Sequence, residues 1–97
     1  MNLNDYRDKC HKTAREKGWW DNDRPLPELL CLIHSEISEA LEAYRQRDMS
    51  GFSEEIADTL IRIFDMAGGI KLDLEKAVLA KMEKNKARPY RHGGKLC

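Results

Sequence analysis

Residues 53–69 read SEEIADTLIRIFDMAGG, and this stretch decides the fold that we expect for the chain. Its apolar residues recur at helical spacing, and the two glycines at its end are typical of a helix terminus. We expect a helix with Ser53 as its N-cap. Its apolar residues cover roughly 160° of the circumference, wider than the usual stripe of about 100°. These residues are Ile56, Ala57, Leu60, Ile61, Ile63 and Phe64.

So wide an apolar face needs more neighbours than a chain of 97 residues provides, which favours a contact between subunits, although a central helix within a monomer would also bury it. Helical patterns also cover residues 3–17, 27–47 and 73–88, with Asp73 as a cap. Strands are improbable, because valine and threonine favour strands and the sequence contains only one valine and two threonines. We therefore predict an all-α fold: a single domain, 1–97, with an irregular tail at about 89–97. The subunit resembles a four-helix bundle and oligomerises through its central helices as a homodimer or homotetramer.

Composition argues against several classes of partner. The formal net charge is zero, so no overall field attracts nucleic acid. The longest strongly apolar run, LLCLI at 29–33, is far shorter than the roughly 20 residues of a membrane span. Three scattered cysteines without a CxxC motif are typical of a reducing compartment, and no signal peptide is visible. We expect a cytoplasmic protein that binds neither nucleic acid nor membrane.

Two pairs of carboxylates lie at three-residue spacing on the second and third predicted helices: Glu36 with Glu39, and Glu55 with Asp58. A short turn makes these helices antiparallel neighbours about 8–10 Å apart. Converging carboxylates would need a cation, and an all-oxygen set suits Mg²⁺. An ordinary solvated face, which is how we interpret Glu42, remains equally open for the pairs. A di-iron bundle is disfavoured because no Glu-x-x-His motif occurs.

Lys81, Asn85 and Arg88 recur at steps of four and three residues on one face of the last predicted helix. Cations there complement the C-terminal end of a helix in any protein. Alternatively, they form a clamp for a polyphosphate that is held by the metal.

Together with the ending HGGK, these motifs resemble the MazG-like members of the all-α NTP pyrophosphatase superfamily, from about His11 to Lys95. The resemblance implies that the four acids bind Mg²⁺ and catalyse hydrolysis of nucleoside triphosphates to monophosphate and pyrophosphate. It also implies that His11 and Trp20 contact the base, because superfamily members acting on deoxycytidine triphosphate have a His and a Trp there.

The expected substrate is a dNTP such as dCTP or dATP, with a role in nucleotide-pool control or house-cleaning. The alternative is a non-catalytic helical module for oligomerisation or partner binding.

Overall fold

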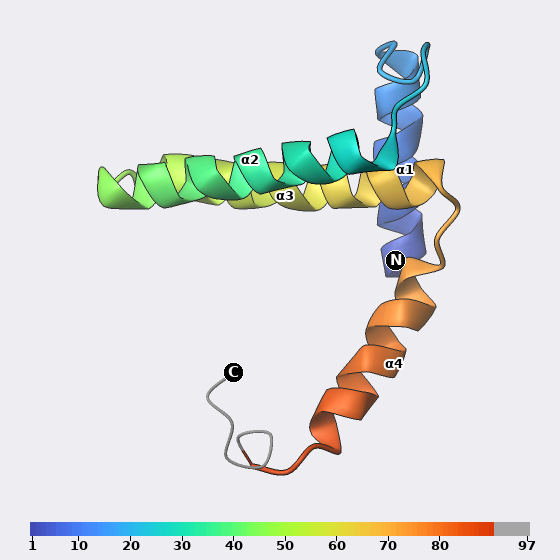
Figure 1. Cartoon of the computed structure of the whole chain (residues 1–97), viewed down its shortest axis with the longest axis vertical. Coiled ribbons are helices and arrows are strands. Elements are labelled where there is room, and N and C mark those ends of the chain that lie inside the picture. Colours follow the sequence, from blue (N-terminus) through green and yellow to red (C-terminus); the bar gives the residue numbers. More distant parts are fainter. Residues whose placement is uncertain (91–97) are drawn as a thin grey trace.

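The structure is a computed structural model that describes residues 1–90, which contain four helices and no strand (Figure 1). The predicted all-α fold is confirmed, and the HGGK ending lies outside the described residues. The helices are α1 (Leu3–Glu16), α2 (Leu26–Arg45), α3 (Met49–Gly69) and α4 (Leu74–Lys86). None of them is both long enough and apolar enough to cross a membrane.

Helices α2 and α3 run antiparallel and side by side, joined by a turn of three residues (Figure 1). Arg47 makes this turn possible with a left-handed backbone conformation, φ 60°. The predicted start of the third helix at Ser53 is wrong. Asp48 is the N-cap, and its carboxylate accepts a hydrogen bond from the Gly51 amide at 2.9 Å. The cap satisfies a free amide of the first turn, so the helix starts five residues earlier than predicted.

Helix α1 crosses α3 near the C-terminal end of α3 (Figure 1). The two glycines at this end permit the close approach. A Cβ atom at Gly68 would collide with His11, and one at Gly69 would collide with the indole ring of Trp20. The glycine pair therefore ends the helix as expected and also forms the surface on which these two aromatic rings pack.

Helix α4 is attached to α1 at its first turn. The Asn4 side chain accepts hydrogen bonds from the amides of Leu74 and Glu75 at 3.0 and 3.1 Å. Arg7 Nη1 donates to the carbonyl of Leu72 at 2.8 Å. Beyond this anchor α4 leads away from α2 and α3 (Figure 1), and every described residue from Leu79 onward is exposed.

The apolar core of the described chain is small. Its buried apolar side chains are Leu29, Ala40 and Ala67, and none of its large side chains is fully buried. On the wide apolar face of α3, Leu60 and Ile61 remain 49% and 50% exposed. One subunit therefore leaves much of this face uncovered.

Candidate metal and nucleotide site

The antiparallel pairing of α2 and α3 brings three of the four predicted carboxylates together. Oxygen atoms of Glu36, Glu39 and Glu55 lie within 4.8 Å of one another. Glu36 is buried, Glu55 is half-buried and Glu39 is exposed. Asp58 is not a member of this group of described residues, but it lines a cavity beside it together with Glu36. Glu42 is exposed and accepts a hydrogen bond from Gln46, as expected for a solvated residue.

The carboxylates perturb one another's protonation. A hydrogen bond shared with Glu36, followed by desolvation and the nearby Glu39 carboxylate, raises the pKa of Glu55 to about 7. The same shared hydrogen bond, assisted by Arg62, holds the pKa of Glu36 below its usual range despite burial. Glu55 Oε2 is buried and has no hydrogen-bond partner among the described groups. The cluster therefore retains a proton near neutral pH where a cation could sit instead.

The residues present fit a hard divalent cation. Three carboxylates provide oxygen ligands only, and Mg²⁺ prefers such ligands over nitrogen or sulfur. The buried oxygen of Glu55 lacks a donor, and buried acceptors normally have one. A bound cation would satisfy this oxygen and offset the repulsion that raises the pKa of Glu55. Glu36, Glu39 and Glu55 are the residues that would hold it.

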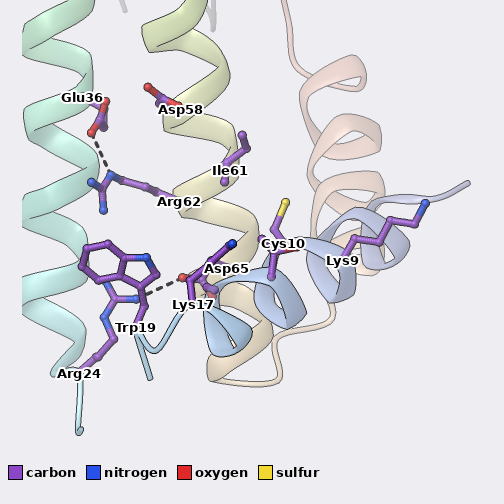
Figure 2. A pocket seen from close by; sticks show the side chains of 12 residues that line it. Lys9, Cys10, Lys17, Trp19, Arg24, Glu36, Asp58, Ile61, Arg62 and Asp65 are labelled. Atoms are coloured by element: carbon purple, nitrogen blue, oxygen red, sulfur yellow. Dashed lines mark hydrogen bonds and ion pairs between the residues drawn. The ribbon is translucent and has the colours of Figure 1, made fainter. Parts of the chain in front are cut away.

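A cavity of about 490 Å³, which we call the α1–α3 cavity, adjoins the acidic cluster (Figure 2). Its volume lies within the usual range for small-ligand sites. Side chains from α1, α2, α3 and the α1–α2 connector line it. They include Trp19, Arg24, Glu36, Asp58, Arg62 and Asp65.

Arg62 lies beside Glu36, and both side chains line this cavity (Figure 2). Its Nε donates to Glu36 Oε1 at 3.0 Å, and its side chain is 38% exposed. Our sequence analysis missed this residue. The available signal was its position four residues after Asp58, which places both side chains on one face of the helix.

His11 and Trp20 converge on Asp65, which is buried. His11 Nδ1 lies 2.9 Å from Asp65 Oδ1, and Trp20 Nε1 donates to the same oxygen at 2.8 Å. Arg24 Nη1 donates to Asp65 Oδ2 at 3.2 Å. Neither His11 nor Trp20 lines the α1–α3 cavity. Their predicted contact with a base stays a prediction, and Asp65 is a further residue that our sequence analysis missed.

Lys81, Asn85 and Arg88 are exposed, and none of them lines the α1–α3 cavity. Lys81 and Asn85 lie on the part of α4 that leads away from the acidic helices, and Arg88 follows just after the end of α4 (Figure 1). A single subunit therefore does not bring the predicted phosphate clamp to the carboxylates.

These features define an all-α protein with a carboxylate centre suited to a divalent cation. The chain is similar to dCTP pyrophosphatase 1 of Bos taurus, with 30% identity over 99 residues, covering 89% of this chain and 58% of the relative. For the Homo sapiens protein of the same name, identity is 29% over 103 residues, covering 93% and 60%. The chain thus spans less than two thirds of these relatives.

These similarities confirm the predicted resemblance to the all-α NTP pyrophosphatases. No family model matches the chain, and no solved structure matches it significantly.

Proposed function

We propose that this chain is an Mg²⁺-dependent pyrophosphohydrolase that converts a dNTP, such as dCTP, to the monophosphate and pyrophosphate. The observation that carries the proposal is the cluster of Glu36, Glu39 and Glu55 beside a cavity large enough for a nucleotide. The names of the relatives support a dNTP as the substrate.

In this reaction water adds to the α-phosphorus while the bond to the bridging oxygen breaks and pyrophosphate leaves. Bound Mg²⁺ supplies positive charge to the phosphate oxygens and makes water more acidic. We assign metal binding to Glu36, Glu39 and Glu55, with Asp58 at the cavity side of the site. Glu39 is the exposed member of this set, and we assign to the same carboxylate the acceptance of the proton of the water.

Arg62 places a guanidinium group beside the Glu36 carboxylate, in the lining of the α1–α3 cavity. A guanidinium group keeps its charge at any physiological pH and binds phosphate oxygens well. We therefore assign Arg62 to neutralising the charge that develops as the phosphoanhydride bond breaks.

We further propose that the enzyme works as a homodimer or homotetramer. The half-exposed Leu60 and Ile61 support a subunit contact through α3, because burying such a face drives association. In an assembly, the predicted phosphate clamp of one subunit can bind phosphates that are held at the carboxylates of another subunit. The clamp consists of Lys81, Asn85 and Arg88.

The test is incubation of the chain with Mg²⁺ and each common dNTP and NTP, with products separated by ion-exchange chromatography. We expect monophosphate and pyrophosphate in equal amounts, fastest with one dNTP. Glu55→Gln should lower the rate at least 100-fold, and the matched variant Glu42→Gln should retain it, because Glu42 is solvated. Release of orthophosphate, or no product with any nucleotide, would contradict the proposal.

A non-catalytic partner-binding module remains the second candidate, since the exposed apolar face of α3 also suits a partner helix. The two candidates differ in their response to metal. An enzyme of the proposed kind should gain thermal stability from Mg²⁺ and dNTP together, whereas a module with a solvated acidic face should gain none.

A further inference from the structure

We propose that Arg62 is an internal cation that competes with the divalent ion for Glu36 and thereby couples metal binding to the binding of substrate phosphates. The inference rests on the proposed function, because it assumes that the carboxylates bind the ion and that phosphates lie in the α1–α3 cavity. Its basis is the contrast between the two arginine–carboxylate ion pairs that line this cavity, Arg62 with Glu36 and Arg24 with Asp65.

The contact between Arg62 and Glu36 is held firmly on one side only. Arg62 Nε donates to Glu36 Oε1 at 3.0 Å, which is the one hydrogen bond that the guanidinium makes to the part of the chain that the structure describes. The Glu36 side chain is 11% exposed and the Arg62 side chain 38%. A single hydrogen bond from a partly exposed guanidinium is weaker than a bidentate pair. Burial therefore fixes Glu36, whereas Arg62 is able to leave it.

The ion pair between Arg24 and Asp65 is of the opposite kind. Arg24 Nη1 lies 3.2 Å from Asp65 Oδ2, and the two side chains are only 14% and 12% exposed. The Arg24 guanidinium also lies 5.0 Å from the centroid of the Trp20 ring, a cation–π contact. A buried carboxylate and an aromatic face therefore hold Arg24 in place from two sides. Of the two arginines, Arg62 is the one free to change its partner.

A divalent ion at the carboxylates would repel the Arg62 guanidinium. Arg62 Nε lies 3.0 Å from Glu36 Oε1. Because Mg²⁺ binds carboxylate oxygens at about 2.1 Å, an ion on this oxygen would lie no more than about 5 Å from Nε. Like charges at such a distance disfavour each other strongly in a partly buried site, because little water and salt screen them. Arg62 and the ion therefore compete for the same carboxylate.

The α1–α3 cavity provides a second position for the displaced guanidinium. Arg62 lines this cavity together with Glu36 (Figure 2), so a rotation of its side chain moves the guanidinium from the carboxylate toward a ligand in the cavity. Phosphate oxygens there suit the planar guanidinium, which binds them in a bidentate manner. Phosphate thus removes the competitor from Glu36 while the ion binds, and each ligand raises the affinity of the other. Metal alone should bind weakly, and metal with nucleotide tightly.

Metal affinity tests the competition without any nucleotide. Mn²⁺ is the probe, because it takes the same oxygen ligands as Mg²⁺ and its free form is measured by electron paramagnetic resonance. Arg62→Gln and Arg62→Met both remove the charge, and the methionine keeps an aliphatic stem. We expect each to bind Mn²⁺ about 10-fold more tightly than the wild type.

Lys9→Gln is the matched control for this titration. It removes the same charge from an exposed residue that lines the cavity from α1, away from Glu36 (Figure 2). It should change the affinity for Mn²⁺ less than about 2-fold, because solvent and salt screen an exposed charge at that distance.

The sign of the change separates competition from a supporting role. If Arg62 instead orients Glu36 for the ion, its neutral variants bind Mn²⁺ more weakly than the wild type. Weaker or unchanged binding in both variants overturns this inference alone. A wild type and variants that all fail to bind Mn²⁺ overturn the proposed function as well.

A second readout uses the wild-type protein itself, labelled with ¹⁵N-arginine for NMR. The signal of Arg62 Nε–H is the one missing from Arg62→Lys. Saturating Mg²⁺ should speed its hydrogen exchange with water by about 10-fold or more, as expected when a charge-assisted hydrogen bond is lost. Arg7 is the internal control, because its Nε donates to Asp8 at 2.9 Å outside the cavity and should exchange as before. Unchanged exchange at Arg62 would show that the ion and Arg62 share Glu36, which overturns the competition.

Discussion

Glu36 and Glu55 are chemically identical side chains whose pKa values shift in opposite directions. Each is the other's main perturbing group, and the Arg62 guanidinium decides which of them keeps the negative charge. The sequence predicts that both acids approach each other, because their spacing and the short turn are visible in it. It does not predict their unequal protonation, because that depends on burial and on the reach of Arg62.

The raised pKa of Glu55 predicts how stability depends on pH without metal. Between the ordinary pKa of Glu55 and about 7, the folded state binds more protons than the unfolded state, so stability falls as pH rises through this range. The shift of Glu36 acts below its ordinary pKa, outside this range. We expect the melting temperature in EDTA to decrease from about pH 5 to pH 7.5.

Glu55→Gln should remove that decrease, and the difference between the two proteins measures the contribution of Glu55. Mg²⁺ should raise the wild-type melting temperature more at pH 7.5 than at pH 5, since at pH 5 a proton occupies Glu55. An identical pH dependence in wild type and variant would refute the assignment.

At the scale of the helices, the acidic cluster depends on the position at which α3 begins. The sequence indicated a helix through Glu55 and Asp58, and the structure confirms it. The start was misplaced because Ser53 and Asp48 are both favourable caps, and local sequence does not show which one the chain uses. Asp48 is used because Arg47 turns the chain in the left-handed conformation directly after α2.

Asp48→Ala should therefore destabilise the protein by about 1 kcal/mol, since it leaves the Gly51 amide without its side-chain acceptor. Asp48→Asn is the matched control and should cost much less, because its amide oxygen still accepts the hydrogen bond. Chemical denaturation measures both. A negligible effect of Asp48→Ala would show that the helix is capped elsewhere, with Ser53 the first alternative.

At the scale of the whole molecule, one subunit leaves its apolar face exposed and its two charged regions apart. The carboxylates lie on α2 and α3, whereas Lys81 and Asn85 lie on the exposed part of α4 and Arg88 follows its end. Helical periodicity predicted that each set shares one face of its helix, whereas α4 ends at Lys86, before Arg88. The periodicity contained no information on the direction of α4, which the hydrogen bonds of Asn4 and Arg7 fix.

Light scattering after size exclusion should therefore give a mass of a dimer or tetramer. Leu60→Glu should shift it toward the monomer and lower activity, because it places a charge in the proposed contact. Leu72→Glu, in the connector before α4, is the control at a comparably exposed leucine and should leave the assembly intact. A fully active wild-type monomer would exclude the shared site.

If subunits share their sites, two inactive variants should complement each other. Glu55→Gln removes a carboxylate, and Arg88→Ala removes a cation that we assign to the neighbouring subunit's site. Mixed and allowed to exchange subunits, they should recover a measurable fraction of wild-type activity, because some sites then carry neither change. Absence of recovery, with exchange verified by mass, would place the cations and carboxylates of one site on one chain.

The sequence by itself determined the helical class, the two acidic pairs and the width of the apolar face, because spacing along a helix fixes which residues share a side. The tertiary structure decided which groups each side of a helix contacts. In it Arg62 donates a hydrogen bond to Glu36, and His11 and Trp20 contact Asp65. Trp19 remains exposed and lines the cavity. These contacts depend on the crossing of α1 over α3 and on two glycines that permit it. Long-range packing of this kind leaves no periodic signal in the sequence.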